Sequence, residues 1–127
     1  DRAKASAHVV VATVAATEAR FETNEFGDRL IVSRVRLAVE EAMKGPGVAS
    51  MDMDLEGGTV GDITLQVSDL PALRPGERAV FFLSPGRGGR LVPHLRGQSI
   101  LKLDARQRVA GSDVTLAEIR EMVRTAK

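Results

Sequence analysis

The chain of 127 residues contains no cysteine, tryptophan or tyrosine, and four phenylalanines are its whole aromatic content. Without cysteine, it forms neither disulfides nor thiolate metal sites. Binding sites for sugars and nucleobases use aromatic rings as stacking platforms, so the shortage of rings argues against both ligands. The longest apolar run, Val9–Ala16, is far shorter than the roughly 20 residues that span a bilayer.

What the chain does contain is typical of a folded domain. Hydrophobic residues make up 43% and charged residues 28%, which predicts one domain over 1–127 with a core of Val, Leu, Ile and Ala. The net charge is +1, but acids dominate 40–77 and bases dominate 84–110. Either the two runs lie side by side and neutralise each other, or they form an acidic face and a basic face that meet partners.

Alternation of apolar and polar residues predicts β-strands over 8–17, 30–41 and 51–56. Because Lys44-Gly45-Pro46-Gly47 is a strong turn signal, the second and third strands should form an antiparallel hairpin. The hairpin would place the Arg34 and Arg36 face across from the Asp54 and Glu56 face, and opposite charges there would support the register. The row of carboxylates therefore needs no metal ion to explain it.

Further short strands are expected over 63–67, 79–83, 91–95 and 99–103, separated by glycine- and proline-rich turns. The apolar segment 79–83 should be buried on both sides. Six or seven short strands predict a mainly β fold, either a sandwich or a small closed or partly open antiparallel barrel, over about 7–104.

The last segment changes period and predicts an α-helix over about 115–126. Its apolar residues recur at helical spacing: Leu116, Ile119, Met122, Val123 and Ala126. The sequence Thr115-Leu116-Ala117-Glu118 has the form of a capping box. The apolar stripe should pack on the barrel or serve a partner.

Two segments are candidate contact surfaces. The polar stretch 18–29 is expected to be a long exposed loop, and it carries Phe21, Asn24 and Phe26. Its two rings either fold back onto the barrel rim or are exposed anchors for a partner. The glycine-rich turn 84–90 carries Arg87 and Arg90 and could hold an anion.

No segment predicts catalysis, a metal site or a cofactor. GGTVG at 57–61 lacks the Lys-Ser/Thr of a phosphate loop and leads into a strand. His8 and His94 are far apart in sequence, and no serine lies in a GxSxG elbow or beside a histidine. We therefore expect a chain that is not an enzyme, with no catalytic residue, no metal and no cofactor.

Several of these segments in order resemble the netrin-like module, the OB-type barrel also found in tissue inhibitors of metalloproteinases. The resemblance rests on VVVATVAATEA (9–19), LIVSRVRLAVEEAMKGPG (30–47), GGTVG (57–61), PGERAVFFLSPG (75–86) and the C-terminal helix. It implies an OB-type fold and a secreted, periplasmic or cell-surface bacterial protein, in agreement with a chain that begins at Asp1 without Met.

The departures limit what the resemblance implies about function. Inhibitors of that family place a free N-terminal cysteine on the catalytic zinc, whereas this chain has Asp1 and no cysteine. Zinc-chelating inhibition therefore does not carry over. The resemblance does imply use of the first long loop, 20–29, as a contact surface.

The leading hypothesis is a non-catalytic, exported protein-binding module whose contacts are Phe21, Asn24, Phe26, Arg87 and Arg90. A specific version is that it regulates a protease by loop insertion. The second hypothesis is binding of nucleic acid or another polyanion through 84–110, against which the lack of stacking rings counts. The third is a small hydrolase using carboxylates near 52–56.

Overall fold

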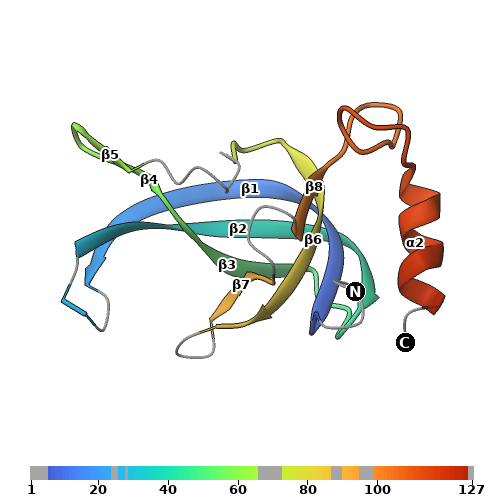
Figure 1. Ribbon diagram of the computed structural model, residues 1–127, viewed down its shortest axis with the longest axis horizontal. Coiled ribbons are helices and arrows are strands. Elements are labelled where there is room, and N and C mark those ends of the chain that lie inside the picture. Colours follow the sequence, from blue (N-terminus) through green and yellow to red (C-terminus); the bar gives the residue numbers. More distant parts are fainter. Residues whose placement is uncertain are drawn as a thin grey trace.

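The structure, a computed structural model, describes residues 6–23, 26–27, 29–65, 73–86, 90–94 and 99–125. Its elements are β1 (His8–Thr23), β2 (Arg29–Lys44), β3 (Ser50–Glu56), β4 (Gly58–Val60), β5 (Ile63–Leu65), β6 (Arg78–Pro85), β7 (Leu91–Pro93), β8 (Ile100–Lys102) and α2 (Leu116–Thr125). Figure 1 shows α2 at one end of the molecule and the β1–β2 hairpin projecting at the other. The predicted mainly β fold with a C-terminal helix is confirmed.

The larger sheet closes on itself as a ring in the order β1-β2-β3-β7-β6, and β6 returns to pair with β1. Neighbours in the ring are antiparallel except β3 and β7, which run parallel and meet at Met53 and Leu91. β8 adds to β6, and β4 and β5 form a small second sheet. The ring is therefore barrel-like but irregular, because one seam is much shorter than the others.

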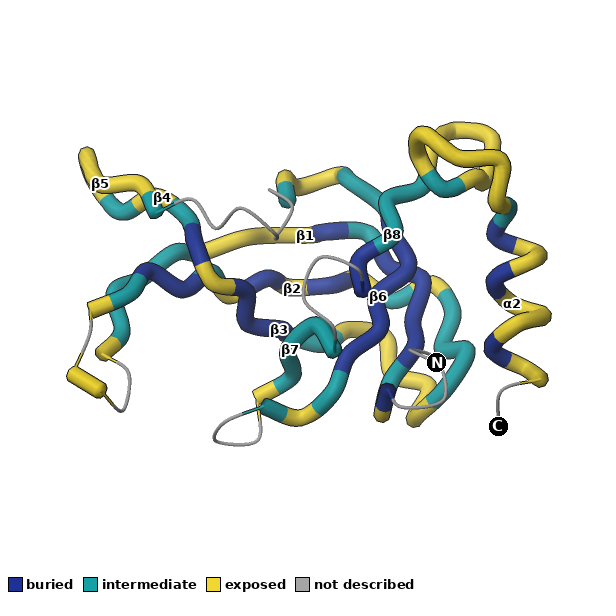
Figure 2. The backbone as a smooth tube through the Cα atoms, viewed as in Figure 1, coloured by how far each residue is buried: buried dark blue, intermediate teal, exposed yellow. Residues whose placement is uncertain are grey.

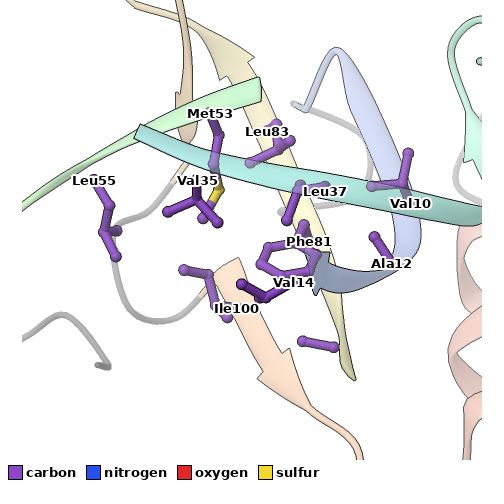
Figure 3. Packing of buried hydrophobic residues seen from close by; sticks show 11 residues of the cluster. Val10, Ala12, Val14, Val35, Leu37, Met53, Leu55, Phe81, Leu83 and Ile100 are labelled. Carbon is purple, nitrogen blue, oxygen red and sulfur yellow. The ribbon is translucent and has the colours of Figure 1, made fainter. Parts of the chain in front are cut away.

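The interior of the ring is filled by alternate side chains of its strands. Val10, Val35, Leu37 and Phe81 are at most 1% exposed and point toward one another in Figure 3. Burial of aliphatic and aromatic side chains contributes roughly 1.5–3 kcal/mol each. This apolar cluster is the main source of stability for the ring.

A second apolar cluster lies outside the ring, under the helix. Val9, Val11, Val80 and Phe82 point outward from β1 and β6, and α2 covers them with its own buried stripe of Leu116, Ile119 and Val123. Because α2 covers one face and the ring interior the other, 79–83 is buried on both sides as predicted. The helical stripe packs on the ring, and Met122 at its margin is 40% exposed.

The predicted Thr115–Glu118 cap and an ion pair between Arg120 and Glu41 hold α2 in place. The Glu118 amide donates to Thr115 Oγ1 at 3.2 Å, and the Thr115 hydroxyl donates to the Glu118 carboxylate. Arg120 donates two 2.8 Å hydrogen bonds to Glu41 on β2, and these bonds lower the pKa of Glu41. The helix is thus capped at its start and tied to the ring at its middle.

The register of β2 and β3 follows the charges, as expected. Arg34 lies opposite Asp54, and Arg36 lies opposite Asp52 with Nε 3.1 Å from Oδ1. The predicted juxtaposition of the two charged faces is correct, although Arg36 lies opposite Asp52 and Glu56 lies opposite Val32. Opposite charges on facing strands support a single register.

The interpretation of 18–29 as a long loop is wrong. β1 continues to Thr23 and β2 begins at Arg29, with Phe21 paired to Ile31. In 18–23 the charged residues Glu18, Arg20 and Glu22 alternate with Ala19, Phe21 and Thr23, a period of two that is typical of a strand, but the turn signals at Asn24 and Gly27 favoured a loop for the whole segment. The segment 18–23 forms a strand because it pairs with β2. The buried side chains of Ile31 and Val32 hold β2 in place, so the backbone groups of β2 are available for this pairing.

The segment 57–61 is also more than a loop, since Gly58–Val60 forms β4. A Cβ on Gly58 would lie 2.5 Å from Ser33 Oγ and 3.0 Å from Ala19 Cβ. The glycine is thus required by close approach of β4 to β1 and β2, at a φ of +131°. The following strand does not join the ring: Ile63 is 57% exposed, and Val67 lies outside the described residues.

Candidate functional site

The most prominent surface feature is an arm built from the distal halves of β1 and β2. β1 pairs with β6 only over His8–Thr13 but with β2 as far as Thr23, opposite Arg29. We call 15–23 and 29–34, with the turn between them, the arm. It projects from the ring on the side away from α2 (Figure 1), and Figure 2 shows its surface as largely exposed or half-buried.

The tip of the arm carries one of the predicted contact residues. Phe26 is 80% exposed, beside Gly27 whose φ of +82° fits a tight turn. Phe21 lies further down, half-buried in β1, with the Arg29 guanidinium 4.1 Å from its ring centroid. Phe21 therefore stabilises the arm, whereas Phe26 is presented to the surroundings. Asn24, the third predicted contact, lies outside the described residues.

A cluster of charged side chains sits at the base of the arm around Asp54. Arg90 Nη1 is 3.0 Å from Asp54 Oδ2 and 2.8 Å from Glu22 Oε2. Arg20 forms an ion pair with Glu22. The guanidinium groups of Arg20 and Arg34 each lie 3.6 Å from the Asp54 carboxylate. We call these five residues the Asp54 cluster. Charge-assisted bonds to a carboxylate that is only 11% exposed are stronger than those of surface pairs.

The Asp54 cluster connects segments that are far apart in the chain. Glu22 comes from the arm, Asp54 from β3 and Arg90 from the end of the 84–90 turn, 68 residues after Glu22. The hydrogen bond from Arg90, opposed by partial burial, lowers the pKa of Glu22. The cluster therefore braces the arm against the ring, and the brace is strongest when Glu22 is ionised.

A shallow hollow of about 440 Å³ lies beside this cluster. It is lined by the apolar side chains of Leu30, Val32 and Val92 and by the polar or charged side chains of Glu22, Thr23, Asp54, Glu56 and Arg90. A mixed lining of this kind could receive one side chain of a partner. Three of the charged groups, Glu22, Asp54 and Arg90, are bound to one another.

The structure brings together two candidate segments that the sequence kept separate. Arg90 was predicted as a contact on its own turn, and it is bound to the arm through Glu22. Arg87 lies outside the described residues. Sequence reasoning missed Glu22 and Asp54, although the alternating charges Glu18, Arg20 and Glu22 were a readable sign of a strand.

One pair near the ring was also missed. Ser84 Oγ lies 2.9 Å from His94 Nδ1, because β6 and β7 are neighbours and Ser84 stands opposite Val92. The described residues place no carboxylate in hydrogen-bond contact with His94. His8 lies elsewhere, against Gly45. Within the described ranges no three His, Asp or Glu side chains are grouped to hold a metal ion.

The acidic and basic runs of the sequence meet at two points of the described structure. Arg90 binds Asp54, and Lys102 Nζ lies 2.8 Å from Glu77 Oε2. The neutralising interpretation of the two runs therefore holds at these points. No helix in the part of the chain that the structure describes is both long and apolar enough to cross a membrane.

No protein-family model matches this chain, and no curated protein matches it significantly. Its function must therefore be argued from the arm and the Asp54 cluster.

Proposed function

We propose that this chain is a non-catalytic, exported protein-binding module that contacts its partner with the arm. The observation that carries the proposal is Phe26, a large ring 80% exposed at the end of a hairpin that the Asp54 cluster braces. Aromatic side chains dominate the energetics of protein interfaces. An arm held in one orientation loses little conformational freedom when it binds, which favours affinity.

The surroundings of Phe26 support a protein partner. The hollow beside the Asp54 cluster combines apolar and charged lining residues, and protein interfaces likewise combine an apolar centre with polar surroundings. Together the tip and the hollow offer one inserted anchor and one receiving depression. Export follows from the resemblance to secreted netrin-like modules, and a protease is the class of partner that this resemblance favours.

The ion pairs of the basic 84–110 segment argue against binding of nucleic acid or another polyanion. Arg90 and Lys102, two bases of the 84–110 run, are bound by Glu22, Asp54 and Glu77. A base already paired with a carboxylate releases fewer counterions when it meets phosphate, so it contributes less to binding. The protein-binding proposal needs no such free bases.

The experiment uses the immobilised chain to capture proteins from the culture supernatant of its source organism. The affinity of each captured protein is then measured for the wild type, for Phe26→Ala and for Val48→Ala. Val48 is a matched control, because it is 41% exposed on the turn after β2, at the opposite end of that strand. We expect Phe26→Ala to weaken binding at least about tenfold, as at an interface hot spot, and Val48→Ala to leave it unchanged.

Equal binding by wild type and Phe26→Ala would contradict the proposal. The protease version has a separate test, in which the peptidase activity of the captured protein is measured with and without the chain. An activity that the chain does not change would contradict that version alone.

A further inference from the structure

Within the described ranges, no strand pairs with the outer edge of β1 along the arm. After Thr13, where pairing with β6 ends, the only other bonds at this edge join Val14 to Gly76 and Glu77 within the described ranges. The next four residues, Ala15–Glu18, are exposed. An open edge presents unpaired backbone N–H and C=O groups and is a template for another strand. The edge available for such pairing is therefore 15–23.

The length of this edge selects one register for pairing with a second copy. Two identical antiparallel segments overlap fully when they pair about their common midpoint, and the midpoint of 15–23 is Ala19. Residues that lie opposite each other in a sheet point to the same side of it. A two-fold axis perpendicular to the sheet therefore requires that one residue lies opposite the same residue of the second copy, with the axis between them. Ala19 meets that requirement.

The charges agree with this register. With Ala19 on the axis, Glu18 faces Arg20 of the second copy, and Arg20 faces its Glu18. Opposite charges directly across strands are attractive, and like charges are repulsive. A register centred on Arg20 would instead place two arginines and two pairs of glutamates face to face. Glu18 is exposed, and no described cation forms an ion pair with it.

We propose that two copies of this chain pair antiparallel through the β1 edge of the arm, with Ala19 on the two-fold axis. The pairing joins both arms into one four-stranded sheet in the order β2-β1-β1-β2. The charges on this edge oppose unspecific strand addition, which edge charges usually prevent, yet in this symmetric arrangement of full overlap they attract each other. The inference does not depend on the proposed function, because Phe26 lies at the tip, outside 15–23.

The first experiment is sedimentation equilibrium of the purified chain across the micromolar range. We expect a reversible monomer–dimer equilibrium, since an edge contact of this size is small for a permanent dimer. Glu18→Lys should weaken it about tenfold, because two attractive contacts become repulsive. Asp62→Lys makes the same charge change on the exposed turn between β4 and β5 and should have less than about a twofold effect.

The second experiment tests the register and uses the absence of native cysteine. In the proposed dimer, Ala19 of one copy lies directly opposite Ala19 of the other, at a Cα separation within the range of a disulfide. Ala19→Cys should therefore cross-link to a dimer under mild oxidation, whereas Ala38→Cys, exposed on β2, should not. Melting curves of both variants show whether each is folded.

A chain that stays monomeric across this range, or a dimer that Glu18→Lys does not weaken, would overturn the inference. Equal cross-linking of Ala19→Cys and Ala38→Cys would overturn the register. Phe26→Ala distinguishes the two proposals, because it should weaken partner binding and leave the dimer intact.

Discussion

The ring and the arm are held by different forces, although they share the strands β1 and β2. In the ring, Val10, Leu37 and Phe81 are at most 1% exposed and belong to one apolar cluster. In the arm, Ala15–Glu18 are exposed, and Ile31 and Val32 are the only buried apolar side chains among its described residues. The other fixed contacts of the arm are backbone pairing, the Arg29–Phe21 contact and the Asp54 cluster. One strand can thus serve a stable core at one end and a recognition element at the other.

This difference has consequences for local stability. Apolar burial is lost only when the ring unfolds, whereas pairs of exposed side chains are weak and screened by salt. Regions with little buried apolar surface open more readily than the core. We therefore expect substitutions in the ring to lower global stability and substitutions in the arm to act mainly on the arm.

The largest effect is expected for Phe81→Ala in the ring interior. Removal of a fully buried ring leaves a cavity and should lower the free energy of unfolding by about 3–5 kcal/mol. Phe21→Ala in the arm is the comparison and should lower it clearly less, because Phe21 is only half-buried. Urea denaturation of both variants measures the difference, and equal losses would contradict the division into ring and arm.

Next in size is Gly58→Ala, where β4 crosses the base of the arm. A φ of +131° and a Cβ 2.5 Å from Ser33 Oγ should together lower stability by about 1–3 kcal/mol. Gly47→Ala is the control, since a Cβ there meets nothing within 4 Å. If thermal melting shows the same shift for both, the close approach of β4 is not what requires the glycine.

A smaller effect is expected for Asp54→Asn in the Asp54 cluster. Loss of the charge that Arg20, Arg34 and Arg90 surround should lower stability by about 1–2 kcal/mol. Asp52→Asn changes the same side chain two residues away, where the only ion pair shown is with the exposed Arg36, so its loss should be smaller. Chemical denaturation at low and high salt compares the two, and a larger loss at Asp52 would exclude Asp54 as the centre of the brace.

The smallest effect concerns pH and is local to the arm. The Arg90 hydrogen bond lowers the pKa of Glu22 in the folded chain. The contribution of Glu22 is therefore complete above the ordinary pKa of glutamate and is lost as the pH falls through the lowered value. Backbone amide NMR shifts in the arm should follow this titration, and Arg90→Gln should move its midpoint upward. An unchanged midpoint would show that Arg90 does not hold Glu22.

Much of the ring could be predicted from the sequence, because its physical signal is local. Ile31, Val35 and Leu37 alternate with charged residues, and the Arg34–Asp54 pair followed from the turn at 44–47. The C-terminal helix was also predicted, since Thr115 and Glu118 form the expected cap at its start. Each of these features depends on neighbours within a few residues or across one hairpin.

The arm and its brace were harder to predict, because their signals are not local. The segment 18–23 alternates charged with uncharged residues, but its uncharged face offers only Ala19, Phe21 and Thr23, and the turn signals at Asn24 and Gly27 that follow favoured a loop. Arg90 meets Glu22 across 68 positions of sequence, a contact that exists only once the ring has closed. The glycines of 57–61 predicted a loop, whereas Gly58 is required because β4 packs closely against Ala19.

Native-state hydrogen exchange tests the central claim most directly, because it measures opening residue by residue. Amides of 8–13 and 79–83 in the ring should exchange only through global unfolding and show its full free energy. Amides of 16–23 and 30–33 in the arm should exchange through a smaller local opening, and Asp54→Asn should accelerate only these. Equal protection of both regions, with one common response to Asp54→Asn, would contradict the account of a stable ring that carries a separately braced arm.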